Sequence, residues 1–257
     1  MDRFLLTGKK AIVSGASYGM GKEMARILAQ EGASVLMTAR GEERLKEACE
    51  ELKAEGLDVI WKTTNVADPN ECREVFAYAI EQFGQIDIVV NNAAKGGMET
   101  IEASWDELID ETVDINLKGP IYYCREAVKH MLPRKTGSII NISSVNGIRP
   151  VCGASYCSSK GGVNTLTQGV ALRLVGTGVR CNAVAPGLTI TPMSNSHEVD
   201  PRQTLEDGVM NPIRNTRTVR TVPTHPLDQA KVVLFLASDL SSAVNGELIT
   251  VDNGSYL

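Results

Sequence analysis

The sequence predicts an α/β fold: one doubly wound parallel sheet of about seven strands, with helices on both faces. Three observations support this prediction. Short apolar runs of strand length alternate along the chain with longer amphipathic segments. The first unit is a strand, a glycine-rich turn, a helix and a second strand. The 257 residues contain no internal repeat and no low-complexity segment, which favours a single domain over residues 1–257.

Seven short apolar runs indicate strands that are buried within the sheet. They cover residues 10–14, 34–38, 57–63, 86–90, 137–142, 179–184 and 247–251. Between these runs, apolar residues recur at helical spacing. The helices predicted from this spacing cover residues 22–31, 42–55, 70–83, 105–117, 120–132, 156–175 and 227–237, with a break near Gly119-Pro120. Strands that alternate with helices at short intervals predict a parallel sheet.

One long segment, residues 191–226, shows neither pattern and is rich in proline, asparagine, threonine and arginine. An irregular connection of this length is uncommon in a compact domain and is usually functional. We therefore expect a substrate-binding lid at about residues 191–226. A disordered insertion is the alternative interpretation.

The composition of the chain excludes several classes of partner. The net charge is −5 and no run is rich in lysine and arginine, so we expect neither nucleic acid nor an anionic membrane as a partner. No apolar run approaches the roughly 20 residues of a membrane span, and the N-terminus becomes polar too soon for a signal peptide. The six cysteines and three histidines are scattered, so we expect free thiols and no metal site. A cytoplasmic location follows from these expectations.

The turn after the first strand predicts a dinucleotide site in a Rossmann-type sheet. Gly15, Gly19 and Gly21 lie between the strand and the helix in the spacing Gly-x-x-x-Gly-x-Gly. Glycines let a phosphate approach the backbone, and a helix N-terminus offers free N–H groups and the positive end of its dipole. The spacing differs from the best-known fingerprint, Gly-x-Gly-x-x-Gly, so a merely tight turn is the alternative.

The end of the second strand indicates which dinucleotide is bound. Enzymes that use NAD place an acid here to hold the ribose 2′-hydroxyl, whereas an arginine accommodates a 2′-phosphate. This chain has Arg40, and the first acid is Glu42. We therefore expect NADP(H) rather than NAD(H). A solvated loop charge is the alternative interpretation of Arg40.

A tyrosine and a lysine four residues apart predict a general acid and its partner. Tyr156 and Lys160 share one face of a helix, one turn apart. A free tyrosine ionises near pH ~10, and a nearby ammonium group lowers that pKa. Such pairs also occur by chance on solvated helices. The loops that follow parallel strands meet at the carboxyl edge of the sheet, however, and this places the pair beside the glycine turn.

The ordered motifs resemble those of the short-chain dehydrogenase/reductase family, in its compact single-domain form, over nearly the whole chain. The matching segments are Ser14 to Gly21, Asn91 to Ala94, Asn116 to Gly119, Asn141 to Gly147, Tyr156 to Lys160, Pro186 to Thr191, Phe235 to Asp239 and Val251 to Gly254. The chain departs from the family pattern in Ser14 for threonine, Asn65 for aspartate and Ala94 for glycine.

The resemblance implies a catalytic set and a cofactor site. The implied catalytic residues are Asn116, Ser144, Tyr156 and Lys160. The expected cofactor-binding residues, Arg40 included, are Gly15, Ser17, Tyr18, Gly19, Met20, Gly21, Arg40, Asn65, Val66, Asn92, Ala93, Ala94, Tyr156, Lys160, Pro186, Gly187, Thr189 and Thr191. The catalytic serine is ambiguous: the pattern Ser-x-x-Gly selects Ser144, and a thirteen-residue gap to the tyrosine selects Ser143. We expect Ser144.

The implied reaction is reversible hydride transfer between the nicotinamide and a ketone or secondary alcohol. Ser144 would stabilise the substrate oxygen, Tyr156 would protonate it, Lys160 would hold the nicotinamide ribose, and Asn116 would hold a water for proton relay. The expected walls of the substrate pocket are residues 94–98, 145–155 and 191–226. Apolar residues of the last segment favour a medium to large, largely apolar substrate.

Two other functions and an assembly remain open. A 3-oxoacyl carrier-protein reductase would need a basic docking patch, for which the candidates are Arg125, Lys129, Arg134 and Lys135. A non-catalytic dinucleotide-binding sensor is the alternative outside the enzymes. The resemblance also implies a homo-oligomer, a dimer or a tetramer, formed through the helices of residues 120–132 and 156–175.

Overall fold

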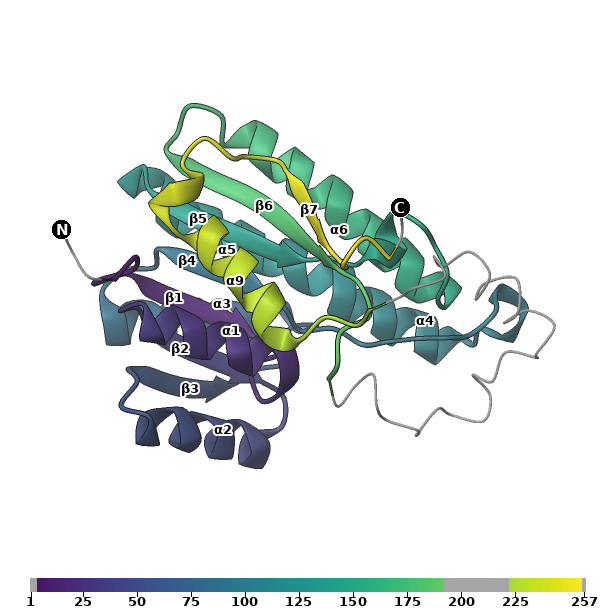
Figure 1. Ribbon diagram of the computed structural model, residues 1–257, viewed down its shortest axis with the longest axis horizontal. Coiled ribbons are helices and arrows are strands. Elements are labelled where there is room, and N and C mark those ends of the chain that lie inside the picture. Colours follow the sequence, from purple (N-terminus) through teal and green to yellow (C-terminus); the bar gives the residue numbers. More distant parts are fainter. Residues whose placement is uncertain (1–3, 192–221, 256–257) are drawn as a thin grey trace.

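The computed structural model describes residues 4–191 and 222–255. Its seven parallel strands form one sheet in the order β3-β2-β1-β4-β5-β6-β7 (Figure 1). The strands are β1 (Lys10–Ser14), β2 (Ser34–Ala39), β3 (Val59–Thr63), β4 (Ile88–Asn91), β5 (Gly137–Ile142), β6 (Val179–Pro186) and β7 (Leu248–Val251). The order reverses between β1 and β4, so the loops after these two strands diverge and leave a crevice at the carboxyl edge of the sheet.

Helices cover both faces of the sheet, which confirms the predicted fold class. They are α1 (Gly19–Gln30), α2 (Glu42–Ala54), α3 (Pro69–Phe83), α4 (Asp106–Val113), α5 (Gly119–Met131), α6 (Ala154–Arg173) and α9 (Pro226–Ala237). Alternate residues of a strand point to opposite faces. Val13 belongs to the core cluster that includes residues of α1, α2 and α9, whereas Ile12 belongs to the cluster that includes residues of α3, α5 and α6.

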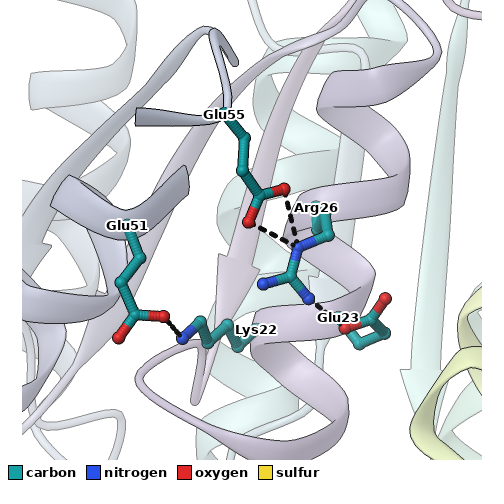
Figure 2. Close-up of polar contacts among 5 residues, drawn as sticks. All are labelled: Lys22, Glu23, Arg26, Glu51 and Glu55. Carbon is teal, nitrogen blue, oxygen red and sulfur yellow. Dashed lines mark hydrogen bonds and ion pairs between the residues drawn. The ribbon is translucent and has the colours of Figure 1, made fainter. Parts of the chain in front are cut away.

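Charged side chains link the first two helices on the surface. Figure 2 shows Lys22 of α1 paired with Glu51 of α2, and Arg26 paired with both Glu55 and Glu23. Exposed pairs of this kind contribute about 0–1 kcal/mol each. Their effect is to fasten α2 beside α1, the helix that follows the glycine turn.

The predicted break near Gly119-Pro120 is wrong. The chain continues from α4 through a π-helical turn (Asp114–Lys118) directly into α5, and Lys118 and Gly119 both have right-handed helical backbone angles. The N–H of Gly119 donates to the carbonyl of Asp114, five residues back. Pro120 lies in the first turn of α5, where a missing N–H is tolerated. The π-helical turn therefore absorbs the proline without ending the helix.

The first helix begins at Gly19, three residues before the predicted start at Lys22. Because glycine is a poor helix former, the sequence predicts a helix that starts only after Gly21, the last glycine of the turn. The earlier start brings the backbone N–H groups of the glycine turn into the first turn of α1. N–H groups in the first turn of a helix have no partner within the helix, so they can donate hydrogen bonds to a bound anion.

Most of the predicted lid, residues 192–221, lies outside the described residues. The chain on either side of it is held together at the carboxyl edge of the sheet. Ile190 N donates to Thr224 O (2.9 Å), and Thr224 N donates to Leu188 O (2.9 Å). Within residues 4–191 and 222–255, no helix is long and apolar enough to cross a membrane.

Candidate active site

A cavity of about 590 Å³ lies in the crevice at the carboxyl edge of the sheet. Loops that follow β1, β2, β3, β4, β5 and β6 all contribute to its wall. Every predicted catalytic or cofactor-binding residue lines this cavity except Asn65 and Asn116. The convergence that the sequence predicts is therefore present in the fold.

The glycine turn, in the middle of the row of loops that line the cavity, fits a phosphate group. Gly15 and Gly19 have positive φ angles of 65° and 57°, which other residues rarely adopt. A Cβ atom at Gly15 would lie 2.7 Å from the Cα atom of Ala93, so the backbone packs too closely for a side chain. Helix α1 has no side-chain cap and no acidic residue in its first turn. Its first N–H groups are therefore available to an anion.

A serine and an asparagine join the turn after β1 to the loop after β4. Ser14 Oγ accepts hydrogen bonds from the backbone N–H groups of Asn92 (3.0 Å) and Ala93 (3.1 Å). Asn92 Nδ2 donates in return to the carbonyls of Ser14 (3.0 Å) and Gly15 (3.1 Å). Within the described part of the chain, the buried Asn92 Oδ1 accepts no hydrogen bond. A buried acceptor without a donor is costly, so this atom fits a hydroxyl of a bound dinucleotide.

Two arginines line the cavity on its β2 side. Arg40 follows β2, has 61% of its side chain exposed, and pairs with Glu111 of α4 at 3.3 Å. Arg44, in the first turns of α2, places its guanidinium 5.1 Å from the ring centre of Tyr18. Both arginines line the cavity. Arg44 was not predicted. Its position, four residues after Arg40 and close to the start of a helix, could have indicated that both side chains lie near the same site.

Asn65 does not reach the cavity because its side chain shapes the loop before α3. Its Oδ1 accepts from the backbone N–H of Ala67 (3.1 Å), and its own N–H donates to Glu71 (2.7 Å). The neighbours Thr64 and Val66 line the cavity in its place. A direct contact between Asn65 and the cofactor stays a prediction that this geometry does not favour.

Tyr156 and Lys160 lie in the first two turns of α6 and line the cavity on its β5 side. Lys160 is 2% exposed, and its Nζ atom donates to the carbonyl of Ile142 at the end of β5 (2.8 Å). The same Nζ atom lies 5.8 Å from the ring centre of Tyr156. Burial lowers the pKa of Lys160 from 10.5 to about 8, because the charged ammonium is removed from water.

The two candidate serines make different hydrogen bonds. The Ser143 hydroxyl is directed to α6, where it contacts Asn164 Oδ1 and the carbonyl of Lys160. Ser144 Oγ instead accepts from the backbone N–H (3.1 Å) and the side-chain amide (3.2 Å) of Asn146. Among the described contacts, both bonds to Ser144 use its oxygen, so its hydroxyl hydrogen can point to a ligand. This geometry favours the expected choice of Ser144.

Asn116 lies behind the cavity wall, in the π-helical turn. Its Oδ1 accepts from Lys95 N (2.7 Å), and its Nδ2 donates to Lys95 O (2.9 Å) and to Ser159 Oγ (3.1 Å). The side chain thus ties the loop after β4 to α6. Both amide hydrogens are used, so the predicted water would have to bind to an oxygen of this residue.

Several lining residues were not predicted from the sequence. Besides Arg44 they are Ala39, Gly41, Thr64, Ile115, Ile142 and Leu188. All except Ile115 and Arg44 lie at or just after the ends of strands, beside residues that were predicted. Ile115 comes from the π-helical turn, and no pattern in the sequence indicated that turn.

Comparisons with known proteins agree with this geometry. A model of the short chain dehydrogenase family matches residues 9–201. A 3-oxoacyl-(acyl-carrier-protein) reductase of Staphylococcus aureus is 35% identical over 251 residues, which are 97% of this chain and 98% of that protein.

Two solved structures are also similar to the chain. An actinorhodin polyketide ketoreductase variant with NADPH is 33% identical, with a TM-score of 0.85 and 96% of each chain covered. Levodione reductase is 29% identical, with a TM-score of 0.86 and 98% of each chain covered. With three quarters of its length matched by the family model, the chain belongs to the short-chain dehydrogenase/reductase family of oxidoreductases.

Proposed function

We propose that the protein is an NADPH-dependent ketone reductase that acts on a medium to large, largely apolar substrate. The observation that carries this proposal is the presence of Ser144, Tyr156 and Lys160 in the wall of the same cavity as the glycine turn and two arginines. When bound, NADPH supplies the hydride. The residues of the chain supply binding, orientation and the proton.

The pyrophosphate would lie at the N-terminus of α1, against the glycine turn. Arg40 and Arg44 would hold the 2′-phosphate by charge-assisted hydrogen bonds. The NADPH in the related polyketide ketoreductase structure and the name of the Staphylococcus aureus relative support this choice of cofactor and of reaction.

At the reacting end, Ser144 donates a hydrogen bond to the substrate oxygen and stabilises the negative charge that develops there. Tyr156 gives that oxygen its proton. Lys160 is mostly protonated at pH 7 because its pKa is about 8, and its positive charge favours the tyrosinate that forms. The carbonyl of Ile142 fixes the ammonium in place during this step.

A second candidate is a 3-oxoacyl-(acyl-carrier-protein) reductase, which the Staphylococcus aureus relative favours. The expected basic docking patch gives it little support. Arg125 and Lys129 both pair with Glu126, and Arg134 pairs with Asp87. These pairs neutralise much of the positive charge that an acidic carrier protein would contact. We therefore favour a free ketone or a small thioester as the substrate over an acyl group on a carrier protein.

A turnover assay separates the candidates. NADPH oxidation is measured with apolar cyclic and open-chain ketones, with a 3-oxoacyl N-acetylcysteamine thioester, and with the same acyl group on carrier protein. We expect turnover of the small substrates, with no large gain in kcat/KM from the carrier protein. A large gain would favour the second candidate. Tight NADPH binding without turnover of any of them would favour a non-catalytic sensor.

We also propose a homo-oligomer formed through α5 and α6. Ile121 on α5 is 40% exposed, and Leu172 at the end of α6 is 77% exposed, so apolar side chains face solvent on both helices. Light scattering tests this proposal, because a monomer at all concentrations would contradict it.

A further inference from the structure

A buried carboxylate lies directly behind the reacting end of the cavity. Glu99, in the loop after β4, is 2% exposed. No lysine, arginine or histidine among the described residues forms an ion pair with it. Burial of an unpaired carboxylate is costly, so such a group requires strong hydrogen-bond donors.

The donors to one carboxylate oxygen, Oε1, come from the first turn of α6, and the buried Oε2 has no hydrogen-bond partner among the described residues. Glu99 Oε1 accepts from the backbone N–H of Ser155 (3.1 Å) and from the Ser155 hydroxyl. Helix α6 has no side-chain cap at Gly153 and no acidic residue of its own in the first turn. Glu99 therefore supplies the missing cap from a loop that is 56 residues away in the sequence.

The backbone joins the same two segments. Gly153 N donates to the carbonyl of Gly97 (3.0 Å), and Ala154 N donates to the carbonyl of Glu99 (3.4 Å). A Cβ atom at Gly153 would lie 2.2 Å from Glu99 Oε2, and one at Gly97 would lie 2.5 Å from it. Because neither glycine has a side chain, the carboxylate fits into the space between them. Any larger residue at either position would collide with Glu99.

The contact lies next to the proposed proton donor. Ser155 immediately precedes Tyr156, and Gly97, Met98 and Tyr156 all line the cavity. We propose that Glu99 is a positioning residue: by capping α6 it fixes the place of the Tyr156 hydroxyl relative to Ser144 and the substrate. The effect on catalysis rests on the proposed function, whereas the capping of α6 does not.

Two readouts test the proposal separately. The first is hydrogen exchange of the peptide that spans the start of α6, measured without substrate. We expect faster exchange there in Glu99→Ala and nearly unchanged exchange in Glu99→Gln, because the amide oxygen still accepts from Ser155. Glu102→Ala is the matched control, since Glu102 is an exposed acid of the same loop.

The second readout is whether the substitution changes kcat or instead changes KM and the NADPH dissociation constant. A displaced catalytic group lowers kcat strongly, so Glu99→Ala should lose about 10-fold or more in kcat. KM and the NADPH dissociation constant should stay near the wild-type values, and Glu99→Gln should recover most of kcat. Glu102→Ala should match the wild type in every measurement.

Unchanged exchange at α6 and unchanged kcat in Glu99→Ala would overturn the proposal. Faster exchange with unchanged kcat would overturn the positioning role and leave only a structural cap. If Glu99→Ala does not fold, the proposal is tested with Ser155→Ala, which removes only the hydroxyl donor. The same two readouts, hydrogen exchange at the start of α6 and kcat, then apply. Failure of the wild type to reduce any ketone would overturn the proposed function, and the exchange experiment would still decide the capping.

Discussion

The ammonium group of Lys160 donates a hydrogen bond of 2.8 Å to the carbonyl oxygen of Ile142, the last residue of β5. This bond fixes a charged group that is almost completely buried in the wall of the cavity. Its burial disfavours the charged form and lowers the pKa of Lys160 to about 8. The protein therefore gives up stability in order to hold this charge beside Tyr156.

We predict that Lys160→Met abolishes turnover and stabilises the protein at neutral pH. The lowered pKa of Lys160 corresponds to a cost of about 3 kcal/mol at pH 7, and the loss of the bond to Ile142 offsets about 1–2 kcal/mol of it. The free energy of unfolding should therefore rise by about 1–2 kcal/mol. Urea unfolding at pH 7 measures this change.

The pH dependence gives a sharper test of the same prediction. Between pH 8 and pH 10.5 the unfolded chain binds more protons at Lys160 than the folded chain does, so the wild type gains stability as the pH rises through this window. The advantage of Lys160→Met should shrink accordingly. The control is Lys231→Met, which changes an exposed lysine of α9. An advantage that is absent at pH 7, or that grows with pH, would contradict the prediction.

We predict that Arg40→Ala changes the choice of cofactor. Loss of a charge-assisted hydrogen bond to a phosphate should weaken NADPH binding about 10-fold or more and leave NADH binding within about 2-fold. Fluorescence titration with both cofactors measures this difference. Arg73→Ala, at an exposed position of α3, is the control. Equal losses for both cofactors would mean that Arg40 does not contact the 2′-phosphate.

Glu111→Gln should act in the opposite direction. Glu111 pairs with both Arg40 and Lys95, and these pairs lower the pKa of its carboxyl, so the group is charged at neutral pH. An exposed ion pair is worth ~0.2–1 kcal/mol, so releasing Arg40 should strengthen NADPH binding up to about 5-fold. The gain should fall as salt screens the charges. Weaker NADPH binding in this variant would contradict the prediction.

We predict that Ser144→Ala loses more of kcat than Ser143→Ala. The Ser144 hydroxyl hydrogen is available to the substrate oxygen, and loss of such a donor typically costs about 100-fold or more in kcat. Ser143 is engaged with α6, so Ser143→Ala should mainly lower the thermal midpoint. Steady-state kinetics and thermal unfolding of both variants measure these effects. A larger kcat loss at Ser143 would reverse the assignment.

The sequence was sufficient to predict the order of strands and helices along the chain and the edge of the sheet where the cavity lies. Buried parallel strands are continuous apolar runs, and their C-terminal loops must meet. It was not sufficient where the outcome depends on contacts between distant residues. Glu99 is one acid among many until the fold places it against Ser155. Asn65 matches a motif position, yet its side chain turns back to Ala67.

The π-helical turn could not be predicted either. A proline after a glycine usually indicates the end of a helix, and no residue pattern signals a bond five residues back. The turn nevertheless sets the position of Asn116 behind the cavity wall and of Ile115 within it.

We propose that Tyr156 donates the proton in an NADPH-dependent reduction. The most direct measurement is the turnover of Tyr156→Phe on the best ketone of the panel, together with its NADPH dissociation constant. Phenylalanine keeps the ring and removes only the hydroxyl, so we predict that turnover is lost while NADPH binds as in the wild type. Turnover near the wild-type rate in this variant would contradict the account.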